Sequence, residues 1–554
     1  MDNTKVWDTL LRDTNERKKK AEQYVKEGKI VAAEDTVALL EAVIKSGDKV
    51  NIEGNNQKQA DFLAECLAKV DPEKINNLHM VQSVVALPSH LDIFERGIAK
   101  KLDYSFSGPQ AGRLAEYVTE GKLELGAIHT YLELFGRYYI DLPPKVALVV
   151  GYEADREGNL FTGFNTEDTP VILEATKFKQ GIVVAQVNKI VDKLPRVDIP
   201  ADWVDYVIEA PKPFYIEPLF TRDPALITDT QILMAMMALK GIYGPYEVQT
   251  LNHGVGFFTA AIELILPTYG EELGLKGKCC SYFALNPHPT MIPAIESGWV
   301  KNIHCFGGEL GMEEYVMARP DLFFIGPDGN LRSNRAFSQV AGLYACDMFI
   351  GGTLQIDKYG NSSTATASRI AGFGGAPNMG CDAKGRRHPS GAWLKCGAEY
   401  GEREKLVGNM PKGKGLVVQM QETFREKMAP TFVEELDAWK LAKNANLDLP
   451  PVMIYSDDLT HIVTEEGIAY LHKCESMEQR MSAIKAVAGY TDIGLQADEK
   501  ETKALREKKI VQTPEDLEID VTRANRSLLA AKNIRELVEW SGGLYNPPAK
   551  FRNW

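Results

Sequence analysis

One glutamate of the sequence stands where a carboxylate can do chemistry. Glu309 lies inside the run GGELG at residues 307–311, so glycines flank it on both sides. This composition predicts a turn at the end of a strand and not the body of a helix. A carboxylate held in such a turn is well placed to act as a nucleophile or a base. Because most glutamates are solvated, an ordinary surface side chain is the competing interpretation.

A glycine-dense segment, RIAGFGGAPNMG at residues 369–380, is the second feature suited to chemistry. Glycine lets a backbone approach a ligand closely and present N–H groups to an anion or a carbonyl oxygen. The residues expected to face a ligand are Gly372, Gly374, Gly375, Ala376 and Asn378. The segment is neither a Walker A loop nor a convincing dinucleotide fingerprint. A tight structural turn is the alternative.

Two further segments carry binding signals. Arg386 and Arg387 follow the glycine segment and can hold a phosphate or a dicarboxylate through paired N–H donors, unless they lie in a solvated loop. Asn252, Gly254 and Gly256 precede an apolar run and predict a strand-to-helix turn. A helix N-terminus at this turn can bind an anion, although a purely structural turn explains the residues equally well.

Cysteine and serine patterns add no second catalytic signature. The eight cysteines contain no C-x-x-C pair, and Cys279, Cys280 and Cys305 lack metal-ligand spacing. We therefore expect buried apolar cysteines, no metal site and a reduced, cytoplasmic environment. The G-x-S-x-G motif of serine hydrolases is absent from the sequence as well.

An internal repeat organises the chain around these residues. A strand entering a loop is predicted at residues 47–54 and again at 246–254. In nearly the same register, residues 155–159 (DREGN) recur as 357–361 (DKYGN), and residues 95–97 (ERG) recur as 296–298 (ESG). Short apolar runs precede the DREGN and DKYGN segments and are typical of buried parallel strands. Several matches in order indicate two copies of one unit.

The repeat predicts an α/β fold built from two similar α/β domains in tandem, each with a mainly parallel sheet. We expect a charged N-terminal helix at residues 1–24, the first domain at 25–220, the second domain at 221–500, and a helical segment with an irregular tail at 501–554. The Pro-rich stretch at 211–224 is interpreted as the connector. Asp35 and Asp229 are expected to be N-caps of the helices that precede the repeated strands.

Composition excludes several classes of protein. The chain has 554 residues, of which 44% are apolar and 25% charged, as expected for a globular protein of several domains. Acidic residues outnumber basic ones, 76 against 63, and the net charge of -13 argues against a nucleic-acid partner. No apolar run approaches the ~18 residues that a membrane span needs, and the N-terminus lacks an apolar signal core. We expect a soluble protein.

The glycine motifs resemble those of a known superfamily. GGTLQIDKYGN at 351–361 and GFGGAPNMG at 372–380 are similar to motifs of family I coenzyme A transferases and citrate lyase alpha subunits. The matching positions are Gly352, Gln355, Asp357, Gly360, Asn361, Gly372, Gly374, Gly375 and Ala376. From residue 45 onwards the chain is most similar to malonate decarboxylase alpha subunits, through stretches such as PKPFYIEPLFTRDP and DVTRANRSLLAAKNIRELVEWSGGLYNPPAKFRNW.

The resemblance implies an acyl carrier protein (ACP) transferase that turns acetyl-S-ACP and malonate into malonyl-S-ACP and acetate. Its partners would be the ACP and the beta and gamma decarboxylase subunits. It would act on a phosphoribosyl-dephospho-coenzyme A arm of the ACP, with no cofactor bound covalently to this chain. The glycine segment would stabilise the oxyanion, and Arg386 or Arg387 would hold malonate.

The resemblance leaves the role of Glu309 open. Coenzyme A transferases carry their nucleophilic glutamate in a Ser-Glu-Asn-Gly-like turn, and Glu309 lies one position away from it in the corresponding turn. Citrate lyase alpha subunits are instead thought to work without a covalent enzyme intermediate. Glu309 is therefore the expected catalytic residue, either as a nucleophile or as a group that orients a substrate.

Three other functions remain open from the sequence. The chain can be a free-standing coenzyme A transferase or a citrate lyase alpha subunit, which differ in the thioester donor and the acid acceptor. It can be a non-enzymatic acyl-CoA or sugar-phosphate sensor, although it lacks a basic helix-turn-helix segment. It can also be a scaffold that only holds the ACP, which predicts no exchange activity.

Overall fold

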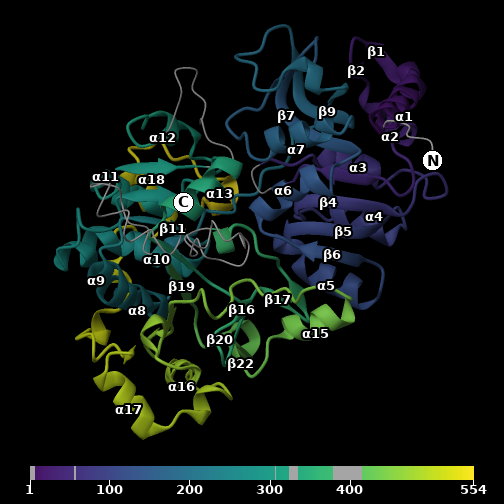
Figure 1. The fold of residues 1–554 in the computed structure, drawn as a ribbon. Helices are drawn as coiled ribbons and strands as arrows, with labels where there is room; N and C mark the ends of the chain where they lie inside the picture. Colours follow the sequence, from purple (N-terminus) through teal and green to yellow (C-terminus); the bar gives the residue numbers. More distant parts are fainter. Residues whose placement is uncertain (1–5, 55–57, 306, 324–334, 379–414) are drawn as a thin grey trace, which may run out of the picture.

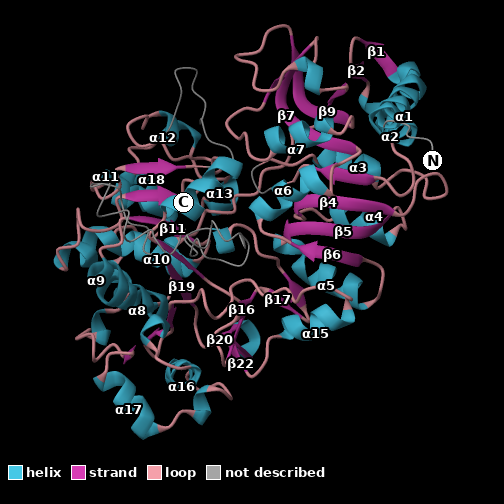
Figure 2. Cartoon of the chain, in the orientation of Figure 1, coloured by secondary structure: helices cyan, strands magenta, loops and turns pink. Residues whose placement is uncertain are grey.

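Two mainly parallel β-sheets, one in each half of the chain, dominate the fold of the computed structural model (Figures 1 and 2). The structure describes residues 6–54, 58–305, 307–323, 335–378 and 415–554. Helices cover the faces of both sheets, as expected when parallel strands alternate with helices. Among the residues described, none of the helices has the length and hydropathy of a membrane-spanning segment.

The first sheet has the strand order β1-β2-β10-β9-β7-β3-β4-β5-β6, with β8 paired to β7. Its strands are β1 (Val25–Glu27), β2 (Ile30–Val31), β3 (Lys49–Ile52), β4 (Leu78–Val84), β5 (Ala99–Phe106), β6 (Glu124–Ile128), β7 (Val146–Asp155), β8 (Leu160–Phe161), β9 (Ile182–Val191) and β10 (Tyr206–Glu209). All neighbours from β10 to β6 are parallel.

The second sheet has the order β13-β12-β11-β14-β19-β23-β24-β25 and is parallel from β13 to β23. Its strands are β11 (Thr250–His253), β12 (Tyr282–Ala284), β13 (Asn302–His304), β14 (Met348–Gly351), β19 (Leu416–Met420), β23 (His461–Val463), β24 (Ile468–Tyr470) and β25 (Val511–Gln512). Small sheets join β15 (Gln355–Asp357), β16 (Ser362–Ser363) and β22 (Phe432–Val433); β17 (Ala365–Thr366) and β18 (Arg369–Ile370); and β20 (Phe424–Arg425) and β21 (Ala429–Pro430).

Six strands follow the same path through both sheets. In the first half, chain order β3, β4, β5, β7, β9, β10 gives the spatial order β10-β9-β7-β3-β4-β5. In the second half, chain order β11, β12, β13, β14, β19, β23 gives the equivalent spatial order β23-β19-β14-β11-β12-β13. The predicted α/β class with two mainly parallel sheets in tandem is therefore confirmed, and the shared topology explains the sequence repeat.

The repeated motifs are structural turns with matching hydrogen bonds. The Oδ1 atom of Asp155 accepts from the backbone of Asn159, whose Nδ2 donates to Oδ2 of Asp155 at 2.8 Å. Asp357 and Asn361 repeat this arrangement, with Nδ2 and Oδ2 2.9 Å apart. The glycine before each asparagine has a positive φ, 94° and 95°, which favours glycine because it has no Cβ.

Helices lie between the strands in the chain and cover the sheets of both repeated units. They are α1 (Val6–Ala21), α2 (Thr36–Val43), α3 (Asp61–Leu67), α4 (Ser89–Glu95), α5 (Ala111–Thr119), α6 (Tyr131–Ile140), α7 (Thr169–Phe178), α8 (Asp229–Ala238), α9 (Gly244–Tyr246), α10 (Phe257–Ile265), α11 (Ile292–Glu296), α12 (Glu313–Met317), α13 (Arg335–Ala345), α15 (Asp437–Asn444), α16 (Met477–Val487), α17 (Glu499–Glu507) and α18 (Ile534–Trp540). The helices α4 and α11 are each followed by a positive-φ glycine, Gly97 and Gly298, which explains the ERG and ESG match.

Of the two predicted aspartate caps, Asp35 is correct in position and Asp229 is wrong. Thr228, one residue before Asp229, caps α8 by accepting from the backbone of Gln231 in a capping box. Asp35 directly precedes α2, but its side chain makes no capping hydrogen bond and pairs with Lys26 at 2.8 Å. A threonine hydroxyl accepts the same capping hydrogen bond as an aspartate carboxylate. Starting α8 after Thr228 and not after Asp229 therefore costs little helix stability.

The C-terminal segment is part of the second half of the molecule. Strand β25 forms one edge of the second sheet, and the core of that half includes Leu528, Ile534 and Tyr545. α18 packs against α11. The last described residues thus lie against the elements that carry the candidate site.

Candidate active site

The first of two crossings between the halves lies where the glycine segment passes the ends of β5 and β6. The backbone N–H groups of Phe373 and Gly374 donate to the carbonyl oxygen of Ser105 at 2.7 and 3.0 Å. In return, the N–H of Ser107 donates to Ala371 at 2.8 Å. Gly372 has a φ of +83°, and a Cβ on it would clash with the Ser105 carbonyl. Glycine in this segment thus allows two backbones to approach each other closely.

A second crossing joins residues 164–168 of the first half to the Glu309 turn of the second. Asn165 accepts a hydrogen bond from the backbone N–H of Gly308. A Cβ on Gly308 would clash with the Phe164 ring, and one on Gly307 would clash with the Glu167 carboxylate. These two glycines therefore let side chains from the other half approach the turn.

Glu309 is buried in this turn, with 1% of its surface exposed, so it is not an ordinary surface glutamate. Thr221 donates to its Oε1 atom from both the backbone N–H, at 2.9 Å, and the side-chain hydroxyl, at 2.8 Å. The backbone N–H of Asn546 donates to Gly311 at 2.8 Å and so ties the tail to the turn. The carboxylate is thus held in one orientation by two donors.

Arg222 follows Thr221 directly and brings a cation to this region. Its NH1 group donates to the carbonyl oxygens of Leu219 and Thr221. Burial lowers the pKa of Arg222, while the charges of Glu309 and Glu263 act in the opposite direction. The Cζ atom lies 5.8 Å from the ring centroid of Phe257, at the start of α10.

A buried network centred on Glu263 lies next to these groups. Its Oε1 atom is 2.9 Å from Nδ1 of His253 and 3.0 Å from Nδ1 of His288, and Thr290 donates to its Oε2. Burial opposes ionisation of Glu263, but His288 and His253 outweigh this effect and lower its pKa to about 2. Phe220 stacks on the His288 ring with centroids 5.2 Å apart.

A second carboxylate, Glu167, lies under the Glu309 turn and pairs with Arg335 of α13. Its Oε2 atom is 2.7 Å from NH2 of Arg335, whose Nε lies 3.3 Å from Asp168. Burial raises the pKa of Glu167 to about 7, although Arg335 acts to lower it. Glu167 also has a φ of +47°, a backbone conformation that costs energy outside glycine.

The strand-to-helix turn at residues 252–256 is present, but its polar groups are engaged in structure. Nδ2 of Asn252 donates to the carbonyl oxygen of Ala284 and so links β11 to β12. A Cβ on Gly254 would lie 2.9 Å from the Cα of Gly351. Gly256 precedes α10 in an extended conformation, and a Cβ added to it would meet no described residue within 4 Å. A ligand role for these three residues stays a prediction.

The remaining predicted site residues fall into two groups. Gly374 has a φ of +58°, and a Cβ on Gly375 would meet the side chain of Gln339 on α13. Ala376 and Asn378 bound the short helical turn that follows. Arg386 and Arg387 lie outside the described residues.

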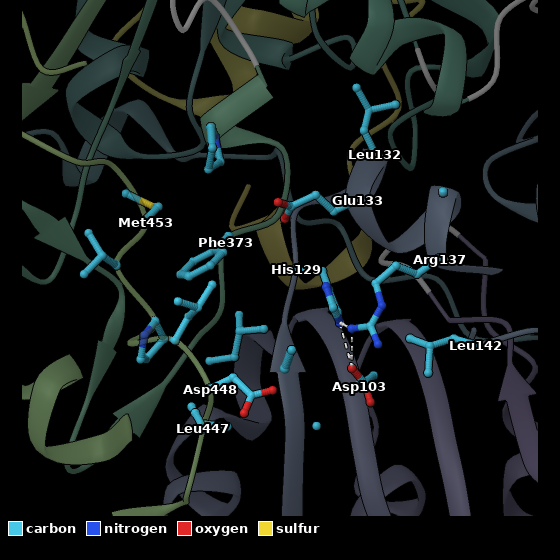
Figure 3. A pocket seen from close by; sticks show the side chains of 18 of the residues that line it. Asp103, His129, Leu132, Glu133, Arg137, Leu142, Phe373, Leu447, Asp448 and Met453 are labelled. Carbon is cyan, nitrogen blue, oxygen red and sulfur yellow. Dashed lines mark hydrogen bonds and ion pairs between the residues drawn. The ribbon is translucent and has the colours of Figure 1, made fainter. Parts of the chain in front are cut away.

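A cavity of about 1160 Å³ opens between the halves on the Phe373 side of the glycine segment (Figure 3). Figure 3 shows Asp103, His129 and Arg137 on one side of it and Phe373 and Met453 on the other. Residues 447–455 complete the second wall. A volume of this size suits a coenzyme-sized ligand.

Two histidines share one carboxylate in this cavity. Nε2 of His79 lies 2.6 Å from Oδ2 of Asp103, and Nε2 of His129 lies 2.7 Å from Oδ1. Burial opposes ionisation of Asp103, but His129 and His79 outweigh it and lower its pKa. A Cβ on Gly126 would clash with this carboxylate, so glycine there makes room for the cluster.

Sequence reasoning missed most of the groups that surround Glu309. Thr221 and Arg222 lie in the Pro-rich stretch that the sequence predicts to be a connector, and Glu167 lies in the other half of the chain. Asp103, with its two histidines, had no motif at all. Arg222, between Thr221 and Asp223, had no local sequence signal that set it apart from a linker residue. Within the described residues no group of three or more potential metal ligands occurs.

Comparison with known proteins identifies the family of this chain. A family model described as "Malonate decarboxylase, alpha subunit, transporter" matches residues 6–554. The chain belongs to the malonate decarboxylase alpha subunit family. A curated relative from Malonomonas rubra, the acetyl-S-ACP:malonate ACP transferase, is 73% identical over 554 residues, covering 100% of both chains.

Solved structures agree with this family. A chain in the crystal structure of a Pseudomonas malonate decarboxylase hetero-tetramer in complex with malonate is 59% identical, with a TM-score of 0.92 and 99% of each chain covered. A structure proposed to be a citrate lyase alpha subunit, from Streptococcus mutans, is 15% identical with a TM-score of 0.58, covering 83% of this chain and 82% of that one. At that identity the likeness concerns the fold alone.

Proposed function

We propose that this chain exchanges acetate for malonate on an ACP thioester, so that acetyl-S-ACP and malonate give malonyl-S-ACP and acetate. The observation that carries this proposal is the 73% identity, over the full length of both chains, to a relative named for that activity. The family and the burial of Glu309 beside Arg222 support it. One thioester replaces another, so the reaction is nearly balanced in energy and needs positioning more than driving force.

Glu309 acts as the nucleophile in this proposal. Its carboxylate attacks the acetyl carbonyl of acetyl-S-ACP, the ACP thiolate leaves, and an acetyl-glutamyl anhydride forms. The thiolate then attacks the glutamyl carbonyl, which releases acetate and leaves an enzyme thioester. Malonate attacks that thioester, the ACP thiolate leaves, and a malonyl-glutamyl anhydride forms. The thiolate then attacks the malonyl carbonyl, which gives malonyl-S-ACP and restores the Glu309 carboxylate. The two hydrogen bonds from Thr221 orient the carboxylate for the first attack.

Direct attack of malonate on acetyl-S-ACP is the alternative within the same activity. It forms a mixed anhydride of acetate and malonate in a ternary complex, and the thiolate then attacks the malonyl carbonyl. Glu309 would only orient a substrate in this case. Both routes need an oxyanion to be stabilised, which we assign to the N–H groups after Gly374, because those of Phe373 and Gly374 already bind Ser105.

The partners follow from the same proposal. The ACP carries a phosphoribosyl-dephospho-coenzyme A arm, and we assign the anionic end of this arm to the cavity of Figure 3, which shares Phe373 and Pro377 with the glycine segment. Lys101 and Arg137 supply positive charge on its wall. Beta and gamma decarboxylase subunits complete the complex and release carbon dioxide. Arg386 or Arg387, the candidates from the sequence, is the alternative proposal for the residue that binds malonate.

Exchange by the purified chain tests the proposal. With acetyl-loaded ACP and malonate, we expect malonyl-S-ACP and acetate but no carbon dioxide. Glu309→Gln is expected to lose roughly a thousandfold or more in rate, as removal of a nucleophile does, whereas the exposed neighbour variant Glu314→Gln retains activity. Hydroxylamine added with acetyl-S-ACP should trap Glu309 in the wild type. Sequential kinetics without a trapped adduct would show direct attack, and carbon dioxide release would contradict the proposed activity.

A further inference from the structure

Among the residues that the structure describes, the guanidinium group of Arg222, near the Glu309 turn, has no carboxylate partner. Arg222 is partly buried, yet it forms no ion pair with any residue that the structure describes. Only its NH1 group is used, for the carbonyl oxygens of Leu219 and Thr221. Partly burying a charge without a counter-ion is unfavourable unless a ligand supplies that counter-ion.

Two other arginines show how this chain normally satisfies such a group. Arg335 places its guanidinium against the carboxylates of Glu167 and Asp168. Arg480 has no carboxylate, but its Nε, NH1 and NH2 all donate to backbone carbonyl oxygens. Arg222 matches neither pattern, since its Nε and NH2 groups have no described acceptor. These two nitrogens form the fork that binds a carboxylate.

A second unpartnered group belongs to the same neighbourhood. His288 is 4% exposed, and its Nε2 atom is buried without a hydrogen-bond partner among the described residues, while Nδ1 is bound to Glu263. Phe220, two residues before Arg222, stacks on its ring. Glu263 therefore links the two groups, because it binds His288 and its charge acts on Arg222. A histidine ring nitrogen that carries a proton is a hydrogen-bond donor, so Nε2 can add a donor to the guanidinium.

We propose that Arg222 and His288 hold the carboxylate of malonate that does not react, and that they thereby select a dicarboxylate over a monocarboxylate acceptor. The inference rests on the proposed exchange activity. In malonate the reacting and non-reacting carboxylates share one carbon, so the second one must find cations close to the nucleophile. Thr221 holds Glu309 and directly precedes Arg222. Burial lowers the pKa of Arg222 but the charge of Glu309 acts to raise it, so the guanidinium lies within electrostatic reach of the proposed nucleophile.

The start of α10 completes this subsite. Arg222 lies over Phe257, the first residue of this nine-residue helix. The partial positive charge at a helix N-terminus adds to a guanidinium that binds an anion. Gly256 leaves the approach open, because a Cβ added to it would meet no atom of the described residues within 4 Å.

Two exchange reactions on the same enzyme test the inference. Labelled acetate exchanges into acetyl-S-ACP without using a second carboxylate, whereas malonate exchange needs it. Arg222→Gln should lower kcat/KM for malonate about a hundredfold, as expected for removal of one partner of a buried charge pair, and leave labelled acetate exchange nearly unchanged. Arg222→Lys should recover part of the loss. Arg523→Gln, at an exposed salt bridge to Glu272, is the control.

His288 allows a matched pair of variants. An asparagine amide can replace Nδ1 and keep the bond to Glu263, whereas a glutamine amide can replace Nε2. We expect His288→Asn to lose discrimination between malonate and acetate, and His288→Gln to retain more of it. Both variants should be checked for folding by circular dichroism, because Glu263 is buried.

Each alternative outcome overturns the inference in a recognisable way. Equal losses of malonate and acetate exchange in folded Arg222→Gln would make Arg222 a positioning residue for Glu309 in place of a malonate ligand. Selective loss of malonate exchange in Arg386→Gln or Arg387→Gln, but not in Arg222→Gln, would move the subsite to those residues. If the wild type exchanges neither acid, the proposed function itself fails, which the two labels distinguish from a failure of the subsite.

Discussion

The two crossings between the halves start from equivalent places in the repeat but are made of different contacts. Each half sends the segment after its DREGN or DKYGN turn to the end of an edge-side strand of the other half. At Ser105–Ser107 the contact consists of backbone hydrogen bonds with the glycine segment. At Gly307–Glu309 it consists of side chains, with Asn165 and Glu167 against the turn. A backbone contact fixes the geometry, whereas a side-chain contact also brings charge.

The register of the repeat makes this difference sharper. Glu309 corresponds to Pro109, so the first half has no acid at the equivalent position. The second turn instead gathers Glu309, Glu167 and Arg335, all nearly excluded from solvent. The repeat therefore provides two similar places, and the second one holds buried charges of the kind that the proposed acyl transfer would use.

The largest effect is expected at the backbone crossing. Gly372→Ala places a Cβ against the Ser105 carbonyl at a φ of +83°. Strain and the displaced strand end should lower the free energy of unfolding by about 3 to 5 kcal/mol. Urea denaturation measures this loss, and exchange activity should fall with it because the two halves separate locally.

Gly256→Ala is the matched control for this prediction. Gly256 has an extended backbone, and no atom in the described part of the chain lies within 4 Å of an added Cβ, so the free energy of unfolding should change little. If Gly372→Ala were as stable as Gly256→Ala, the glycine segment would not be an inter-half contact in solution.

The charged crossing should show itself through pH. The pKa of Glu167 is about 7 in the folded chain, mainly because of burial, and lies at 4.5 for an unperturbed glutamate. The folded chain keeps a proton that the unfolded chain loses between these values. The stabilising contribution is complete below pH 4.5 and is lost as the pH rises through 7, by roughly 3 kcal/mol.

Denaturation curves measured from pH 4.5 to 8 test this dependence. Glu167→Gln should flatten the decline, whereas the exposed variant Glu157→Gln should keep it. An identical decline in Glu167→Gln would mean that another group titrates in this window.

The smallest effect should be the same in both halves. Asn159 and Asn361 each donate to an aspartate and accept from a distant backbone N–H, that of Ala201 or Ser456. Replacing either asparagine by alanine should cost about 2 kcal/mol of unfolding free energy, because buried or partly buried partners are left unpaired. Unequal costs, measured by urea midpoints, would break the equivalence of the two turns.

The fold could be predicted from the sequence because the residues that form its repeated turns are close together in the chain. The turn at Asp155–Asn159 needs a glycine at one position and an asparagine at the next, and the same requirement applies at Asp357–Asn361. Such rules leave a pattern that survives when the rest of a repeat diverges. Two copies of it, with apolar runs before them, were sufficient to predict two similar sheets.

The surroundings of the candidate site were harder to predict because they are made by distant segments. No periodicity relates Asn165 to Gly308, which lie in different halves. Glycine density indicated a close approach, but it does not specify whether a ligand or another backbone approaches; at Gly372 it is Ser105. Arg222 was overlooked because prolines around it suggested a connector with no role beyond length.

The contact between Asn546 and Gly311 has a consequence for the order of synthesis. A ribosome that has made the first 540 residues has completed both sheets, both crossings and Glu309, yet the backbone bond that Asn546 gives to the turn does not exist. Tyr545, whose hydroxyl lies 3.5 Å from that of Thr221, is missing as well. The turn that carries Glu309 thus gains these contacts only once residues 545 and 546 have been made, and a chain released before them lacks part of the surroundings of its proposed nucleophile.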